Sequence, residues 1–219
     1  YFKNIFFQSM PITISICGYA LAAAIIFTYV GQSGEYAVAG YGVGTRIEQV
    51  VLLPILGINT AIISIIAQNY GAKNFDRIKQ SYFTAIQYAF IIMVTSGIIV
   101  FISAGFITSI FSSDPEVIEY GKRYLKISAF VLPAYPVFFL SNGFFMALKK
   151  SENAMISNFF RNVLNPIVVF YIAKHIDASF ETFFWIWVGI NWFFSISYFF
   201  VVVYYFKAKL NKSSAVVHP

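Results

Sequence analysis

Long uncharged runs alternate with short charged segments along the whole chain. Five windows contain no Asp, Glu, Lys or Arg, and they cover residues 4–34, 49–72, 81–113, 127–148 and 182–206. A helix needs roughly 20 apolar residues to cross the hydrocarbon core of a membrane, so each window is long enough. A sixth run, residues 154–173, qualifies if the membrane tolerates Arg161. We therefore predict an all-α membrane protein whose single domain, residues 1–206, is a bundle of six transmembrane helices at about 5–30, 38–69, 81–111, 124–148, 154–173 and 183–206.

Charge placement orients this predicted bundle. Only 11% of the residues are charged, whereas soluble domains have about 25%. If the six helices alternate in direction, nine Lys and Arg residues fall on one side and four on the other. Because short cytoplasmic loops are rich in Lys and Arg, both ends should be cytoplasmic, in a plasma (bacterial inner) membrane, with 207–219 as a basic tail. The net charge of +6 then needs no nucleic-acid partner, and membrane lipids are the expected surroundings.

Catalytic and metal-binding signatures are lacking. The sequence has no nucleophile elbow, no phosphate-binding glycine loop and no CxxC motif. Its single cysteine, Cys17, excludes an internal disulfide, and His175 and His218 are too isolated to form a metal site. We expect neither an enzyme nor a bound cofactor. No signal peptide is visible, and because the chain opens on Tyr1 rather than Met, we expect a piece of a longer protein.

Proline and glycine residues mark the places where the predicted spans should bend. Pro11 lies in the first span, Pro54 and Gly57 in the second, and Pro133 in the fourth. A proline in a membrane helix frees a backbone carbonyl, so each position is either a fixed kink or a hinge for movement.

Helix ends are also visible between the spans. Gly71 suits a left-handed position after the second span, and Asn74 suits the N-cap of a short surface helix. Asp114 and Pro115 suit the N-cap and first turn of an amphipathic helix along the outer interface. Aromatic residues near the span ends are typical of interface anchors.

Polar side chains within the predicted spans are the candidates for function, because lipid cannot hydrogen-bond them and they usually face the bundle interior or a wet cavity. The candidates are Arg46, Glu48, Gln49, Asn142, Arg161 and Asn165. A bundle with several such groups more often transports a solute than serves only as a scaffold.

Glu48 is the only acidic residue deep within the predicted spans. Arg46 is a poor partner for it, because neighbours on a helix face lie three and four residues apart. By helix rise, the Cα atoms of Glu48 and Arg161 lie within ~4 Å in depth, so the two can pair if their helices are adjacent. The alternative is that both arginines extend toward headgroups. A carboxylate that alternates between apolar surroundings and a nearby cation could also bind and release a proton.

The sequence also resembles a known family. The second span and its exit, "YAVAGYGVGTRIEQVVLLPILGINTAIISIIAQNYGAKNFDRIKQ", are similar to the C-terminal half of multidrug and toxic compound extrusion (MATE) transporters. "FSSDPEVIEYGKRYLKI" and "ALKKSENAMISNFFRNVLNPI" are similar to later segments of that half. The resemblance implies one six-helix lobe of a twelve-helix transporter, whose partner is the missing N-terminal lobe of the same chain.

This resemblance implies an antiporter that exports cationic or amphipathic drugs in exchange for H⁺ or Na⁺ by alternating access. Tyr19 stands where one branch of the family has a coupling Glu, and 149–151 stand where that branch has an Asp, so a sodium site of that kind is not expected. The alternatives are a lipid-linked oligosaccharide flippase of the same superfamily and a non-transporting membrane subunit. A flippase tends to line its cleft with several cations, whereas these spans offer only Arg46 and Arg161.

Overall fold

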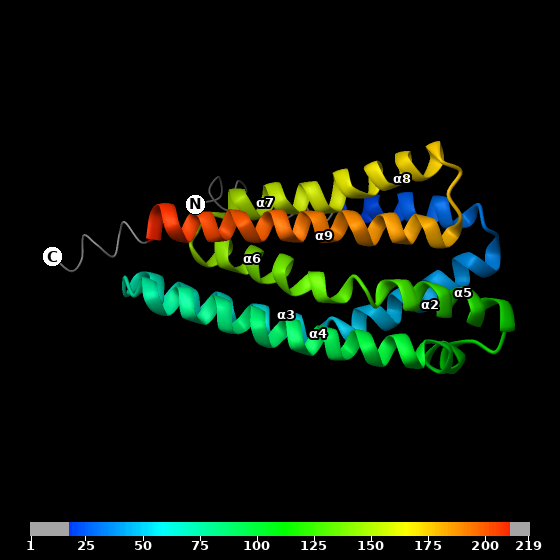
Figure 1. Cartoon of the computed structure of the whole chain (residues 1–219), viewed down its shortest axis with the longest axis horizontal. Helices are drawn as coiled ribbons and strands as arrows, with labels where there is room; N and C mark the ends of the chain where they lie inside the picture. The colour runs from blue at the N-terminus through cyan, green and yellow to red at the C-terminus, as the bar shows by residue number, and fades with distance from the viewer. Residues whose placement is uncertain (1–17, 211–219) are drawn as a thin grey trace, which may run out of the picture.

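The computed structural model of the protein describes residues 18–210, and within that range every regular element is helical. The helices run side by side along the long axis of the molecule (Figure 1). A first helix is described over Gly18–Gly31. The elements after it are α2 (Glu35–Val51), α3 (Leu53–Gly71), α4 (Phe75–Phe111), α5 (Pro115–Ser128), η1 (Leu132–Ala134), α6 (Tyr135–Ala147), α7 (Ser151–Phe159), η2 (Phe160–Leu164), α8 (Asn165–His175), α9 (Phe180–Tyr205) and η3 (Phe206–Leu210).

Four segments in the described range are long and apolar enough to cross a membrane. They are Glu35–Gly71, Phe75–Phe111, Pro115–Ala147 and Phe180–Ala208, and they match the predicted second, third, fourth and sixth spans. The chain is thus an all-α membrane protein.

The other two predicted spans are described less fully. The first appears only as the shorter apolar helix Gly18–Gly31, and its predicted start and Pro11 lie outside the described residues. The fifth, residues 154–173, is helical but passes through the π-helical turn η2. A count of six spans therefore stays a prediction.

The predicted kink in the second span lies at Leu52, between α2 and α3. Pro54 falls in the first turn of α3, where its missing N–H would have no intrahelical partner in any case. Gly57 lies inside the regular part of α3, and a Cβ there would meet nothing within 4 Å. The interruption of the span thus lies at Leu52, next to Pro54, whereas Gly57 stands within the continuous helix α3.

The fourth span breaks at Pro133, as predicted, and a second proline, Pro136, follows the break. Pro133 lies in the 3₁₀ turn η1, and Pro136 lies in the first turn of α6. Trp192 of α9 donates its indole N–H to the Phe130 carbonyl, at 2.8 Å, just before the break. A neighbouring helix thus satisfies a carbonyl near the interruption, as an apolar environment requires.

Two predicted helix ends need correction. Asn74 does cap a helix, accepting from the Arg77 N–H at 3.3 Å, but that helix is α4 itself, which continues to Phe111 instead of ending as a short surface helix. Gly71 is the last residue of α3, and the left-handed residue is Lys73, with φ 55°. The charged residues of 72–80 favoured a separate surface helix. The membrane helix instead begins within this charged segment, because such helices can extend beyond the apolar core.

α5 was wrongly predicted to lie along the interface. Its cap is as expected, since the Asp114 side chain accepts from the N–H groups of Glu116 and Val117. However, α5 packs against α2 and α4. A Cβ on Gly40 of α2 would lie 2.7 Å from the backbone nitrogen of Gly121 of α5, so two glycines allow a close helix crossing.

The C-terminal boundary also differs from the predicted one. The last helix continues past residue 206 through η3 to Leu210, so the predicted tail, 207–219, begins as helix. Residues 211–219 lie outside the described residues.

Candidate transport cavity

A cavity of about 320 Å³ lies among the first helix, α2, α5, α6, the α7–η2 segment and α9. A volume of this size is typical of small-molecule sites. Most of its lining is aromatic or aliphatic, and its charged lining residues are Glu48 and Arg161. Its polar lining also includes Tyr19, Tyr41, Thr45, Gln49, Tyr124, Tyr135, Asn158, Asn162 and Trp187.

Glu48, in the last turn of α2, is held by two tyrosine hydroxyls from the fourth span. Tyr124 donates its hydroxyl to Oε2, and Tyr135 donates to Oε1 at 2.5 Å. Gly44, one turn earlier on α2, makes room for this arrangement, because a Cβ there would collide with the Tyr124 ring. Both carboxylate oxygens are thus occupied by neutral donors.

Arg161 lies opposite, in the π-helical turn η2. Its guanidinium carbon lies 4.2 Å from the ring centre of Phe138, 4.8 Å from that of Tyr135 and 5.2 Å from that of Phe139. These are cation–π distances. The π turn is closed by the Asn165 N–H, which donates to the Phe160 carbonyl five residues earlier. Pro166 follows at once and cannot donate a helical N–H, which gives a local reason for the irregular turn.

The ion pair that the sequence allowed between Glu48 and Arg161 is not formed. The two residues line the same cavity and interact electrostatically, but over residues 18–210 no ion pair within 4 Å includes either of them. Tyr135 lies between the two charges, since its hydroxyl donates to Glu48 and its ring contacts Arg161.

The remaining candidates divide between the cavity and the helix packing. Gln49 lines the cavity, whereas Arg46 is exposed and does not. The Asn142 Oδ1 accepts from Ser157 at 2.7 Å and from Tyr198 at 3.2 Å, which joins α6 to α7 and α9. Asn165 is fully buried, and its amide has no hydrogen-bond partner in the described part of the chain.

Several cavity residues were not singled out from the sequence. Tyr41, Tyr124 and Tyr135 were not among the candidates, although all three line the cavity. Tyr135 lies within the uncharged run 127–148, whereas Tyr124 stands between Arg123 and Lys126. The available signal was that a tyrosine hydroxyl must find a partner in the bundle. Tyr19, noted as the position of an absent carboxylate, also lines the cavity.

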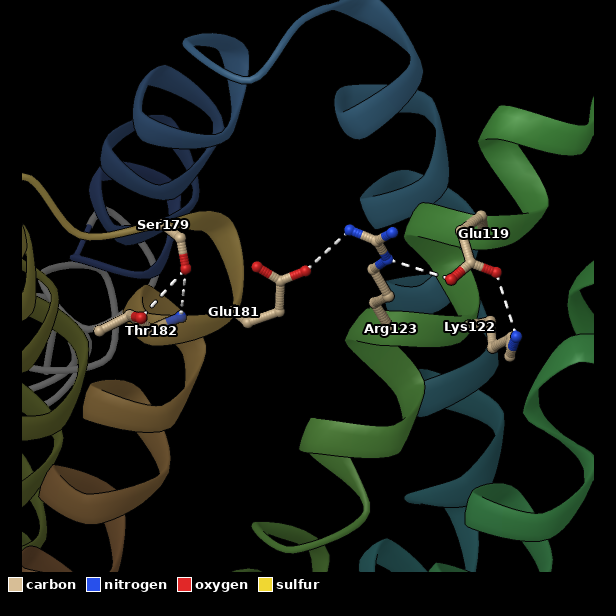
Figure 2. Close-up of polar contacts among 6 residues, drawn as sticks. All are labelled: Glu119, Lys122, Arg123, Ser179, Glu181 and Thr182. Atoms are coloured by element: carbon tan, nitrogen blue, oxygen red, sulfur yellow. Dashed lines mark hydrogen bonds and ion pairs between the residues drawn. The ribbon is translucent and has the colours of Figure 1, made fainter.

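The ion pairs of the described residues lie elsewhere, at the end of the bundle where α5 and α9 begin. Glu119 pairs with Lys122 and with Arg123, both at 3.1 Å, and Arg123 reaches Glu181 of α9 at 3.0 Å. Figure 2 shows Arg123 between its two carboxylate partners. This cluster ties α5 to α9, and about half of the Arg123 side chain is exposed.

Comparison with known proteins places this arrangement in context. A family model described as MatE matches residues 11–171. A protein named FAD transporter from Shewanella oneidensis is 26% identical over 158 residues, which are 72% of this chain and 35% of that protein. The multidrug export protein MepA of Staphylococcus haemolyticus is 24% identical over 70% of this chain and 34% of its own length.

Solved structures agree in fold. A MATE crystal structure with the ligand MaL6 superposes with a TM-score of 0.86 at 20% identity, covering 93% of this chain and 46% of that one. An inward-facing MATE transporter of the MOP superfamily gives 0.86 at 21% identity, covering 97% and 49%. The chain thus spans about a third of these curated relatives and about half of these solved chains. Because the family model covers most of its length, the chain belongs to the MatE family.

Proposed function

We propose that this chain is one lobe of a secondary-active efflux antiporter, which exports amphipathic organic compounds, cations among them, in exchange for H⁺ or Na⁺ by alternating access. The family membership supports export of small molecules, since relatives are named for multidrug export and for FAD transport. This chain matches only about half of the length of the solved transporter chains, which supports a second lobe as its partner. Both ends of the segment face the cytoplasm in this proposal.

The observation that carries the proposal is the Glu48 carboxyl group, held by two tyrosine hydroxyls at the edge of the cavity. An ionised carboxylate only accepts hydrogen bonds, so it suits two hydroxyl donors. A protonated carboxyl group carries a hydrogen on one oxygen, and that oxygen becomes a donor. Protonation of Glu48 therefore reverses one of the two tyrosine bonds, because a tyrosine hydroxyl can also accept, and it removes the charge that strengthens both bonds.

Protonation of Glu48 can in this way alter how firmly neighbouring helices are held to α2. Tyr124 belongs to α5 and Tyr135 to α6, on either side of the break at Pro133. When Glu48 becomes neutral, its hydrogen bonds to both hydroxyls weaken, and α5 and α6 are held less firmly to α2. An exchange of protons at Glu48 then biases the break in the fourth span, which gives a physical route from the coupling ion to a movement of the lobe.

The experiment is dye efflux from proteoliposomes that contain the full-length protein, driven first by a proton gradient and then by a sodium gradient. Efflux under either gradient is expected, and efflux under neither overturns the antiporter proposal. Glu48→Gln keeps the shape but cannot ionise, so we expect it to abolish efflux driven by its coupling ion. Glu35→Gln is the matched control, because Glu35 is exposed in the first turn of the same helix.

A further inference from the structure

The two charged residues of the cavity, Glu48 and Arg161, contact different kinds of side chain. Glu48 has a hydroxyl donor on each oxygen. Arg161 has three aromatic rings around its guanidinium carbon, and in the described range no carboxylate lies within 4 Å of it. Aromatic rings balance part of a positive charge, and the Tyr135 hydroxyl also hydrogen-bonds to Arg161, but a single hydroxyl satisfies only part of the five N–H donors of a guanidinium. Arg161 thus keeps N–H donors for a ligand, whereas both Glu48 oxygens already accept a hydrogen bond.

Polar groups on the same helix face add to this positive site. Asn158 and Asn162 line the cavity together with Arg161. The Asn158 Oδ1 already accepts from the Asn142 side chain at 3.3 Å, so its NH₂ group is the part left to meet a ligand. An arginine fork beside amide donors is the usual way in which proteins hold a phosphate or a carboxylate.

A cluster of aromatic rings in the lining suits a planar, apolar body. Tyr41 and Phe184 are stacked with their ring centres 5.4 Å apart, and Tyr124 meets Tyr41 edge-on at 5.0 Å. All three rings line the cavity, as does Trp187. A ligand in this cavity can therefore meet both the cationic and amide donors and this aromatic wall.

We infer that this cavity binds aromatic organic anions, with Arg161, Asn158 and Asn162 receiving a phosphate or carboxylate group and the aromatic wall receiving the ring. The inference rests on the proposed function and narrows its substrate class at this lobe. Arg161 is the specificity-determining residue. A cavity with Glu48 as its only charge would favour cations, and the positive charge of Arg161 shifts the preference toward anions.

A charge series on one ring system tests the inference. The probes are 1-naphthyl phosphate, the neutral 1-naphthol and the cation (1-naphthylmethyl)trimethylammonium, titrated into the full-length protein in nanodiscs without any ion gradient. We expect the phosphate to bind most tightly. Arg161→Gln should weaken phosphate binding by about 10- to 100-fold, as for a lost hydrogen bond to a charged group, and should leave naphthol binding unchanged.

Two further variants separate recognition from folding. Arg161→Lys keeps the charge without the fork, so it should retain a preference for the phosphate at reduced affinity. Arg46→Gln removes an exposed arginine outside the cavity and should bind all three probes as the parent does. Each variant's unfolding temperature shows whether it is folded.

Opposite results overturn the inference. The anion site is refuted if the cation binds most tightly, or if a folded Arg161→Gln variant binds the phosphate as the parent does. In either case, gradient-driven dye efflux would still support the antiporter. Intact phosphate binding without efflux under either gradient overturns the antiporter and retains the anion site.

Discussion

The close crossing of α2 and α5 gives a sharp prediction for Gly40→Ala. A Cβ at this position would lie 2.7 Å from the Gly121 nitrogen, 2.7 Å from the Tyr120 Cβ and 2.8 Å from the Val117 carbonyl oxygen. Contacts this short are not relieved by a rotamer change, because backbone atoms of α5 are involved. The two helices must separate by roughly 1 Å, and overpacking of this kind destabilises a core by about 1–3 kcal/mol.

The same shift reaches the candidate transport cavity. Glu48 follows Gly40 by eight residues, or ~12 Å along α2, and it is bonded to Tyr124 of α5 across this crossing. Separation of the helices should therefore lengthen that bond and reduce efflux as well as stability.

Gly42→Ala is the matched control, because a Cβ at Gly42 would meet nothing within 4 Å. Alanine is favoured over glycine inside a helix by about 1 kcal/mol, so this variant should be as stable as the parent or slightly more so. Thermal unfolding in detergent, followed by loss of helical circular dichroism, compares the two. For a chain of this length, 1 kcal/mol corresponds to a shift of about 2–4 °C. Equal unfolding temperatures for the two variants would refute the close crossing.

Three other predictions concern single contacts. Gly44→Ala should displace the Tyr124 ring from Glu48 and lower efflux more than it lowers the unfolding temperature; unchanged efflux would contradict the role of that bond. Asp114→Ala removes an N-cap that accepts from two N–H groups, which should lower the free energy of unfolding by about 0.5–2 kcal/mol. Hydrogen exchange in the first turn of α5 should become faster, and unchanged slow exchange there would contradict the prediction. Arg123→Gln removes ion pairs that are about half exposed, and such pairs contribute about 0–1 kcal/mol to stability. The unfolding temperature of this variant should therefore fall only slightly, and its difference from the parent should shrink in high salt. A large difference that persists in high salt would contradict this.

Local chemistry was predicted well from the sequence. Asp114 and Asn74 cap helices because a side-chain oxygen at such a position satisfies free N–H groups whatever surrounds it. The break in the fourth span was also foreseeable, since Pro133 and Pro136 cannot supply helical N–H groups.

The cavity was less predictable, because its contacts depend on how helices pack. Glu48 meets Tyr124 only because Gly40 and Gly44 let α2 approach α5 closely, and the apolar pattern does not reveal which glycines lie at a crossing. The depth estimate placed Glu48 and Arg161 near one another, and they do line one cavity. It could not foresee that Tyr135 would lie between them, since helix rise gives depth but not rotation about the helix axis.

The π-helical turn at Phe160–Leu164 has a consequence for how related proteins can diverge. Such a turn holds one residue more than the α-helical turn it replaces, and each residue of an α-helix corresponds to about 100° of rotation. Deletion of one residue from "FRNVL" would convert the π turn into an α-helical turn, which completes about the same rotation with one residue fewer. The faces of α7 and α8 would then keep nearly their present directions, so Asn158 would still face the cavity. A single codon can thus be gained or lost in this turn with little effect on how the two flanking helices face the cavity, and relatives can differ in length here at small cost.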